Sequence, residues 1–253
     1  MHEVSKALPM EAGMWALFLD VDGTLIDIAE TPDSVDVPPE LPRQVAALSQ
    51  SLDGALAMVS GRSIAAIDAL FDPFRFAAAG LHGMEIRSSP DGPVERVAVN
   101  GDDLGAARRK LDDLAQAWPG MIVEDKDIGF AVHYRKAPDA ANDVDRLVDA
   151  LLAQMGREWM RQDGKMVVEI RPSGTNKGDA VARLMATARF RGRFPITIGD
   201  DLTDEMMFAY ANDALGRSIR VGTGAHSSLA QFTVESPRSI REWIARLAHS
   251  ATV

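Results

Sequence analysis

Apolar residues in the first third of the chain fall into short runs that alternate with helical patterns. Three runs, residues 15–19, 55–59 and 76–79, have the length of buried strands, and polar turn residues follow each of them. Between the runs, apolar residues recur at helical spacing over residues 41–52 and 63–71. This alternation predicts an α/β fold with a doubly wound parallel sheet.

The pattern changes near Val94 and returns after residue 172. In between, helical spacing over residues 102–118 and 140–154 is followed each time by two short strand-like segments, and Asp163-Gly164 is a typical turn signal for the second pair. This order suits a small antiparallel sheet covered by two helices. We therefore expect an inserted α+β domain over residues 96–171, within a parallel-sheet domain formed by residues 1–95 and 172–253.

Composition excludes several classes of protein. The chain has 253 residues and a net charge of −10, which argues against broad binding to nucleic acid or to an anionic membrane. It contains no cysteine, so disulfides, zinc–thiolate sites and cysteine nucleophiles are excluded. Residues 1–11 show no leader-like pattern, and no stretch approaches a membrane span. A cytoplasmic location is the resulting expectation.

Two carboxylates directly follow the first apolar run. Asp20 and Asp22 stand two residues apart, where a central strand gives way to a tight turn. Open α/β sheets bind their ligands at this edge. Carboxylates held so close repel each other unless a proton or cation is shared, and a hard ion such as Mg²⁺ prefers oxygen ligands. The segment therefore indicates a Mg²⁺ site, although an aspartate-rich turn without function has the same composition.

Other polar residues occupy equivalent places at strand ends or helix starts, so we expect them to converge with the first pair at one edge of the sheet. The candidates are Asp20 with Asp22, Ser60, Lys177, and Asp200 with Asp204. A carboxylate can attack phosphorus, and a second can act as general acid and base. A hydroxyl, a lysine and N–H groups at a helix start can hold phosphate oxygens.

Each candidate also has a purely structural interpretation. Taken alone, Lys177 fits a solvated lysine, Ser60 a turn residue, and Asp204 a helix amino end. These interpretations become improbable in combination, because each residue would have to mimic one motif in sequence order. Arg62 stays open between a contact to phosphate, a contact to the inserted domain and a pair with a nearby acid. His82 fits a structural turn residue better than a catalyst.

In this combination the chain resembles the haloacid dehalogenase superfamily of phosphatases. The resemblance rests on Asp20-Val21-Asp22-Gly23-Thr24, Ser60-Gly61-Arg62, Lys177 and Gly199-Asp200-Asp201-Leu202-Thr203-Asp204, in the family's order. An insertion stands where that superfamily places a type 2 cap. The resemblance implies a Rossmann-like core, an aspartyl-phosphate intermediate and Mg²⁺.

Further strings are similar to the trehalose-6-phosphate phosphatase family. They are Gly80-Leu81-His82-Gly83, Glu124-Asp125-Lys126, Glu169-Ile170-Arg171-Pro172, Asn176-Lys177-Gly178 and the segment from Gly199 to Glu205. That similarity implies hydrolysis of trehalose 6-phosphate to trehalose and phosphate. It leaves a functional pairing with a separate trehalose-phosphate synthase open.

Residue roles follow from the same resemblance. Asp20 would be the nucleophile and Asp22 the general acid and base, while Ser60 and Lys177 would bind phosphate. The implied metal set is Asp20, Asp22 through its backbone carbonyl, Asp200 and, through water, Asp204. The expected substrate-binding set is Gly23, Gly61, Arg62, Glu124, Lys126 and Glu169. Glu124, Lys126 and Glu169 would bind the distal glucose.

Three alternatives remain open from the sequence. The first is a related phosphatase for another sugar phosphate, such as sucrose phosphate or mannosyl phosphoglycerate. The second is a phosphomutase of the same superfamily, which would isomerise its substrate. The third is a non-catalytic sugar-phosphate sensor, against which the intact Asp20 and Asp22 pair argues.

Overall fold

The computed structural model describes residues 14–28, 35–97, 102–126, 128–223 and 227–250. The chain divides into two compact units, which we call the core unit (Met1–Arg96 with Asn176–Val253) and the inserted unit (Val97–Thr175). The sequence predicted an inserted domain over residues 96–171. Its predicted start lies one residue before that of the inserted unit, and its predicted end lies four residues before. Residues 1–11, for which the sequence showed no leader-like pattern, lie outside the described residues.

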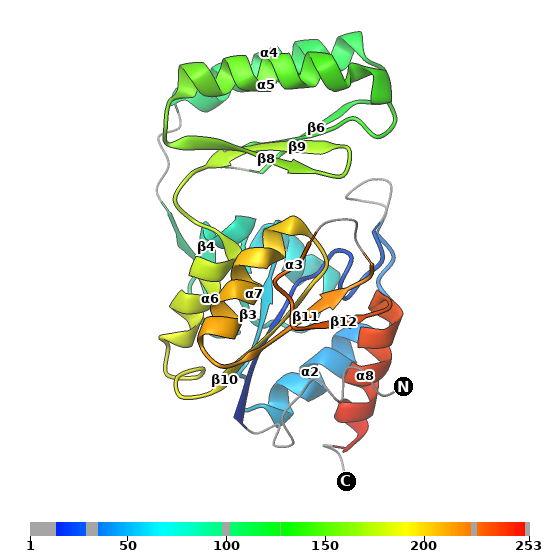
Figure 1. The fold of residues 1–253 in the computed structure, drawn as a ribbon, viewed down its shortest axis with the longest axis vertical. Helices are drawn as coiled ribbons and strands as arrows, with labels where there is room; N and C mark the ends of the chain where they lie inside the picture. Colours follow the sequence, from blue (N-terminus) through cyan, green and yellow to red (C-terminus); the bar gives the residue numbers. More distant parts are fainter. Residues whose placement is uncertain (1–13, 29–34, 98–101, 127, 224–226, 251–253) are drawn as a thin grey trace. The chain divides into compact units, whose positions relative to one another are not determined.

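The core unit is built on one eight-stranded sheet with strand order β12-β11-β10-β1-β2-β3-β4-β5 (Figure 1). The strands are β1 (Trp15–Leu19), β2 (Leu56–Val59), β3 (Ala77–Gly80), β4 (Glu85–Arg87), β5 (Glu95–Arg96), β10 (Phe194–Gly199), β11 (Arg217–Val221) and β12 (Phe232–Val234). The strand β1 is central, and every one of its residues is buried. Burial on both faces explains why it reads as an unbroken apolar run.

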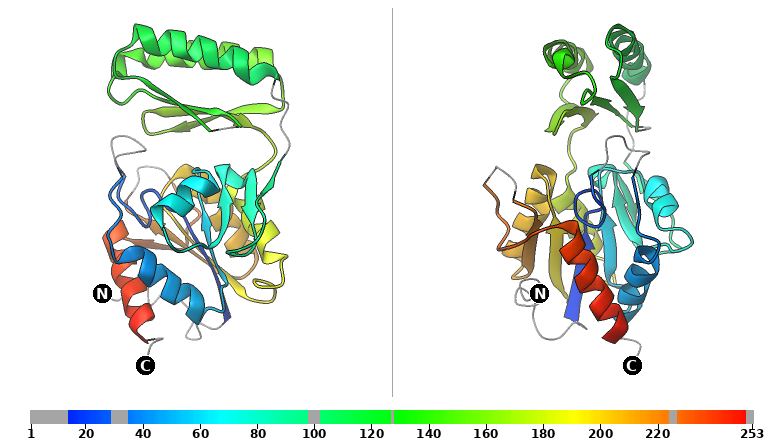
Figure 2. Two further views of the ribbon diagram at one scale, coloured as in Figure 1. Left: turned by 180° about the vertical axis from the view of Figure 1, so that it is seen from behind. Right: turned by 90° about the vertical axis from the view of Figure 1, so that its right-hand side faces the viewer.

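Helices cover both faces of this sheet. The helices α2 (Leu41–Ser51), α3 (Ile64–Leu70) and α8 (Pro237–Ser250) lie on one face, and α6 (Lys177–Met185) and α7 (Glu205–Asp213) lie on the other (Figures 1 and 2). The aromatic rings of Phe18 and Phe190 stack with 5.4 Å between their centroids. The predicted α/β class with a doubly wound sheet is confirmed.

The sheet departs from the prediction at one edge. Beyond β3 the sheet continues with β4, which is antiparallel to β3, and β5, which is antiparallel to β4. The sequence patterns did not predict either strand. Their polar residues explain the omission. Glu85 and Arg87 are buried, and Arg87 is neutralised by Asp68, to which it donates two hydrogen bonds of 2.6 and 2.7 Å. A hydrophobic pattern cannot reveal a strand that is buried through ion pairs.

The inserted unit has a four-stranded antiparallel sheet with strand order β6-β7-β9-β8. Its strands are β6 (Ile122–Asp125), β7 (Phe130–His133), β8 (Trp159–Gly164) and β9 (Val167–Pro172), and its helices are α4 (Asp102–Ala117) and α5 (Ala141–Met155). Val132, Val168 and Ile170 share a separate hydrophobic cluster with Val144 and Val148 of α5. The inserted unit therefore has its own core.

The turn of the second hairpin differs from the prediction. Asp163-Gly164 belongs to β8, where Gly164 pairs with Val167, so the turn lies at Lys165-Met166. Met166 has a φ of 63°. The alternating burial of β9 fixes this register, because a shift would move the buried Val168 and Ile170 away from the hydrophobic cluster. Local turn propensity is overridden by packing.

The described residues also contain the short 3₁₀ helices η3 (Leu81–Gly83), η4 (Pro138–Ala140) and η5 (Leu202–Asp204). The helix η3 directly follows β3. The helix η5 follows Asp200 and Asp201, the two residues after β10. Among the helices of the described residues, none is long and apolar enough to cross a bilayer.

Candidate active site

Two parallel central strands place the first catalytic candidates side by side. The strands β1 and β10 are in register, with Leu19 opposite Ile198, and the Asp20 N–H donates to the Ile198 carbonyl over 2.9 Å. Asp20 follows the last residue of β1, and Asp200 follows Gly199 at the end of β10. Both carboxylates therefore stand at the carboxyl edge of the sheet, as the strand pattern predicts.

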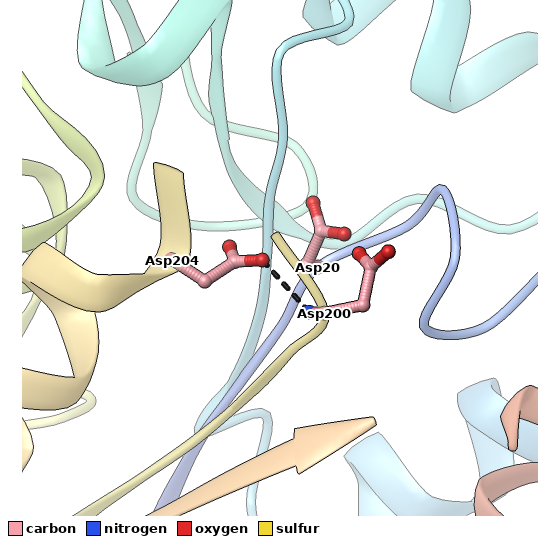
Figure 3. A group of neighbouring side chains, drawn as sticks. All are labelled: Asp20, Asp200 and Asp204. Atoms are coloured by element: carbon pink, nitrogen blue, oxygen red, sulfur yellow. Dashed lines mark hydrogen bonds between the residues drawn. The ribbon is translucent and has the colours of Figure 1, made fainter. Parts of the chain in front are cut away.

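Asp204 joins this pair from η5, and Figure 3 shows the three side chains together. One oxygen of each carboxylate lies within 4.8 Å of the others. The Oδ2 of Asp204 accepts from the N–H groups of Asp200 at 2.9 Å and Asp201 at 3.0 Å. These bonds hold the loop after β10 closed around the carboxylate. The same two hydrogen bonds stabilise the turn after β10 and hold the Asp204 carboxylate in place.

Lys177 connects two of the three carboxylates. It is the first residue of α6, whose preceding Asn176 forms a reciprocal capping box with Asp179. Its Nζ lies 2.7 Å from Oδ1 of Asp20 and 2.6 Å from Oδ1 of Asp204. The exposed fractions of the Lys177, Asp20 and Asp204 side chains are 3%, 5% and 0%. The ammonium group is therefore buried between two carboxylates.

Burial and mutual repulsion control the charges of this cluster. Burial of Lys177 opposes its charge, but Asp20 and Asp204 outweigh that effect and raise its pKa, so the lysine stays cationic. Burial, helped by Asp204 and Asp200, raises the pKa of Asp20 well above its ordinary value despite Lys177. Burial and then Asp204 raise the pKa of Asp200 to about 7. One lysine does not neutralise three carboxylates.

The residues of this cluster fit a hard divalent cation. The buried Oδ1 of Asp200 has no hydrogen-bond partner within the part of the chain that the structure describes. A buried carboxylate oxygen without a donor is costly, and a cation would satisfy it. Besides burial, repulsion from neighbouring carboxylates raises the pKa values of Asp20 and Asp200, which a bound cation would counteract. All three side chains supply oxygen ligands, which Mg²⁺ prefers.

The side chain of Asp22 points to a different partner. Its two oxygens accept from Arg62, with 2.7 Å from Nε to Oδ2 and 2.6 Å from Nη2 to Oδ1. The structure shows one of the three interpretations left open for Arg62, the pair with a nearby acid. A contact of Arg62 to phosphate or to the inserted domain stays a prediction. The Asp22 side chain is 37% exposed and is not among the three side chains of the acidic cluster. The general-acid role predicted for Asp22 needs a carboxylate that can leave this pair.

Ser60 lies at the end of β2, where its side chain is buried. Its N–H donates to the Ala79 carbonyl over 2.9 Å, and its Oγ accepts from the Arg62 N–H at 3.2 Å. Residues 60–62 form the loop that leads to α3, and we call them the Ser60 loop. Its position at the carboxyl edge of the sheet is the one that the strand pattern predicts.

The two glycines expected to bind substrate have tight surroundings. A Cβ on Gly23, whose φ is +79°, would lie 2.1 Å from Oδ2 of Asp200. A Cβ on Gly61 would lie 2.8 Å from Nε2 of His82. The structure thus gives each glycine a role in close packing, whereas a contact to substrate stays a prediction.

The inserted unit brings its own predicted residues together. Register across β6, β7 and β9 aligns Glu124, Ala131 and Glu169, so both glutamates lie on one face of that sheet. The carboxylate of Glu124 lies 2.9 Å from Lys126 Nζ and 2.9 Å from His133 Nε2. Burial works against the charge of Glu124, but the bonds from His133 and Lys126 lower its pKa.

Sequence reasoning did not identify His133 as a partner of Glu124. Its place in the alternation of β7 gives the face on which it lies, but not that a histidine there bonds a glutamate on β6. The bond of Asp204 to backbone N–H groups was likewise missed, although Asp201 and Asp204 have the spacing of a capping box.

Comparison with known proteins agrees with these motifs. The family model described as trehalose-phosphatase matches residues 18–238. A probable trehalose-phosphate phosphatase of Sinorhizobium fredii is 47% identical over 243 residues, covering 96% of this chain and 91% of the relative. The trehalose-6-phosphate phosphatase of Escherichia coli K12 is 40% identical over 225 residues, covering 89% of this chain and 84% of the relative.

A solved structure gives the same result for the fold. The C-terminal domain of the trehalose-6-phosphate phosphatase of C. albicans matches with a TM-score of 0.81 and 22% identity, covering 94% of this chain and 93% of that one. At this identity the likeness concerns the fold alone. The matches in sequence carry the assignment, and the chain belongs to the trehalose-phosphatase family.

Proposed function

We propose that this protein hydrolyses trehalose 6-phosphate to trehalose and phosphate, with Mg²⁺, through an aspartyl-phosphate intermediate. The observation that carries the proposal is the buried group of Asp20, Asp200 and Asp204 around Lys177 at the carboxyl edge of the sheet. A site that only bound sugar would not need three partly uncompensated carboxylates. The names of the relatives at 47% and 40% identity support the substrate.

The first step is attack on phosphorus by Asp20. Its rigid place after β1 aims the carboxylate, and the buried Lys177, 2.7 Å away, favours the ionised form that can attack. In the same step the bond between phosphorus and the sugar oxygen breaks, and the departing oxygen takes a proton from Asp22. For this Asp22 must leave Arg62 and be in its protonated form. In the second step Asp22 takes a proton from the water that hydrolyses the acyl phosphate.

Phosphate oxygens would be held by Ser60 and Lys177, which supply a hydroxyl and an ammonium group. Asp20, Asp200 and the backbone carbonyl of Asp22 would hold Mg²⁺. Asp204, both of whose oxygens already accept hydrogen bonds, would support this site from behind. When bound, the ion supplies the positive charge that offsets repulsion between carboxylate and phosphate.

The inserted unit would act as the cap that selects the sugar. Glu124, Lys126 and Glu169 offer charged acceptors and a donor from one face of its sheet. Such groups suit a substrate rich in hydroxyls. An analogue that lacks a hydroxyl would leave a polar group of the protein without its hydrogen-bond partner and would therefore bind more weakly. A cytoplasmic location and a pairing with a synthase remain predictions.

The test is release of inorganic phosphate from trehalose 6-phosphate, measured with Mg²⁺ and after its removal by a chelator. Glucose 6-phosphate and sucrose 6-phosphate serve as comparison substrates. We expect Mg²⁺-dependent release from the trehalose ester well above release from the other two. Preference for another ester would retain the phosphatase and overturn the substrate, whereas isomerisation without phosphate release would indicate a mutase.

A further inference from the structure

The η3 turn directly after β3 has an unusual backbone. Leu81 and His82 have φ values of 50° and 54°, so two successive residues with side chains adopt the left-handed conformation. Both side chains are buried. Residues with a Cβ rarely adopt this conformation, and they keep it only where surrounding contacts impose it. The contacts that impose it here lead to the Ser60 loop.

Successive N–H groups of the turn bind that loop. The Leu81 N–H donates to the Arg62 carbonyl over 2.9 Å, and the His82 N–H donates to the Ser60 carbonyl over 3.1 Å. In an extended strand successive residues face opposite sides, so the two groups could not reach one loop. The left-handed turn thus fixes the carbonyls on both sides of Gly61.

The His82 ring supports the same loop from its side chain. A Cβ built on Gly61 would lie 2.8 Å from Nε2 and 2.9 Å from Cε1 of the ring. Side-chain atoms do not approach so closely, so Gly61 is needed where the ring lies, and the ring closes the space behind the loop. The side chain of Ser60, next in the chain, is also buried.

From these contacts we propose that His82 is a positioning residue for the Ser60 loop. It would act on phosphate binding through Gly61 and Ser60, without touching the substrate itself. The inference rests on the proposed function, because Ser60 must bind phosphate for its position to matter. The left-handed backbone at Leu81 and His82 determines the positions of the carbonyl groups of the Ser60 loop. The His82 ring determines how closely this loop approaches η3. Together they fix the direction of the Ser60 hydroxyl.

The experiment measures binding of inorganic phosphate by calorimetry in the presence of Mg²⁺, together with thermal stability. Gly61→Ala adds a Cβ against the ring, and His82→Asn removes the ring while keeping a residue that tolerates the left-handed conformation. We expect the dissociation constant to rise about tenfold for Gly61→Ala, since small misplacements of binding groups are costly. For His82→Asn we expect a rise of about threefold by the same argument.

The double variant is the decisive measurement. In Gly61→Ala/His82→Asn the smaller side chain leaves room for the new Cβ, so we expect phosphate binding to recover to near the level of His82→Asn alone. Residues in contact give such non-additive effects, whereas independent sites multiply. A double variant whose loss equals the product of the two single losses would overturn the proposal.

A matched control separates positioning from general strain. Leu215 also has a positive φ, of 58°, and its side chain is exposed on the core unit. Leu215→Asn should leave phosphate binding unchanged. If His82→Asn lowers only the melting temperature, or if Leu215→Asn weakens phosphate binding equally, the positioning role is wrong. If the unmodified protein does not bind phosphate, the proposed function is overturned as well. This outcome differs from the two above, which overturn only the positioning role of His82.

Discussion

The core unit and the inserted unit each pair lysine with carboxylate, but with different degrees of burial. In the core unit, the side chains of Lys177 and its two partners are at most 5% exposed. In the inserted unit, the side chains of Lys126 and Glu124 are 17% and 28% exposed. Charges interact far more strongly where water is excluded. The fully buried set suits the bond-making chemistry proposed for it, and the partly exposed set suits the proposed recognition of a sugar.

This contrast predicts effects of different size in the two units. Changes among the buried charges should affect turnover and folding severely, because no water replaces a lost partner. Changes on the sheet of the inserted unit should alter the choice of substrate while leaving stability nearly unchanged. Four experiments, from the largest expected effect to the smallest, test this comparison.

Asp20→Asn should lower kcat by about 10⁴-fold or more, as loss of a catalytic nucleophile does. The amide has nearly the same shape but cannot form the acyl phosphate. Steady-state phosphate release from trehalose 6-phosphate measures the loss. Asp27→Asn is the matched control, since Asp27 is 73% exposed and pairs with Arg241 in the same unit. Appreciable turnover by Asp20→Asn would refute its role as nucleophile.

Lys177→Met should lower the free energy of unfolding by about 3–5 kcal/mol, because Asp20 and Asp204 are left buried without their cation. Urea unfolding followed by circular dichroism measures the change. Lys110→Met is the control, because Lys110 makes an exposed hydrogen bond to Gln154 in the inserted unit. A loss below that of the control would mean that the buried lysine is not the main counter-charge.

Metal-free protein should become less stable as pH rises from about 4 towards 7. The pKa of Asp200 is raised from 3.8 to about 7, so the folded state binds more protons than the unfolded state between these values. The loss should amount to between about 1 and 4 kcal/mol, at 1.4 kcal/mol for each pKa unit. Asp200→Asn should reduce this slope.

Urea unfolding in the presence of a chelator, from pH 4 to pH 8, measures the slope. Mg²⁺ should oppose it, because the ion binds the ionised carboxylates and so stabilises the folded state most at the higher pH. A stability that rises between pH 4 and pH 7 without metal would contradict the charge deficit inferred for the cluster.

Glu124→Gln should lower kcat/KM for trehalose 6-phosphate about 10- to 100-fold, as lost polar contacts to a substrate do. Hydrolysis of a small aryl phosphate should change little, because that substrate lacks the distal glucose. Parallel assays of the two esters give the ratio. Glu158→Gln, an exposed change in the same unit, should leave the ratio unchanged. Equal losses on both esters would end the assignment of Glu124 to sugar recognition.

Sequence patterns predicted the parts of the fold that depend on hydrophobic burial. The strand β1 and the positions of Asp20 and Asp200 at the carboxyl edge follow from apolar runs that stop at polar residues. The strand β4, between β3 and β5, was missed because Glu85 and Arg87 are buried through partners distant in sequence. Patterns of apolar residues in the sequence identify strands that the hydrophobic effect stabilises, but not strands whose buried side chains form ion pairs.

The site shows the same limit. Motif order predicted which residues gather. It left a pair of Arg62 with a nearby acid open, but it did not identify the partner as Asp22, 40 residues earlier. Nor did it predict that Lys177 bridges Asp20 and Asp204. Such contacts depend on side-chain geometry after the sheet has formed. They cannot be derived from spacing along the chain.

The central place of β1 between β2 and β10 has a consequence for how the protein folds. Its partner β10 begins at Phe194, far later in the chain, and the whole inserted unit is made in between. During synthesis one edge of β1 stays unpaired until β10 has been made. Because the inserted unit has its own hydrophobic core, we expect it to fold in the meantime. We therefore expect closure of the central sheet to be the slow step of folding, because it joins the most distant segments.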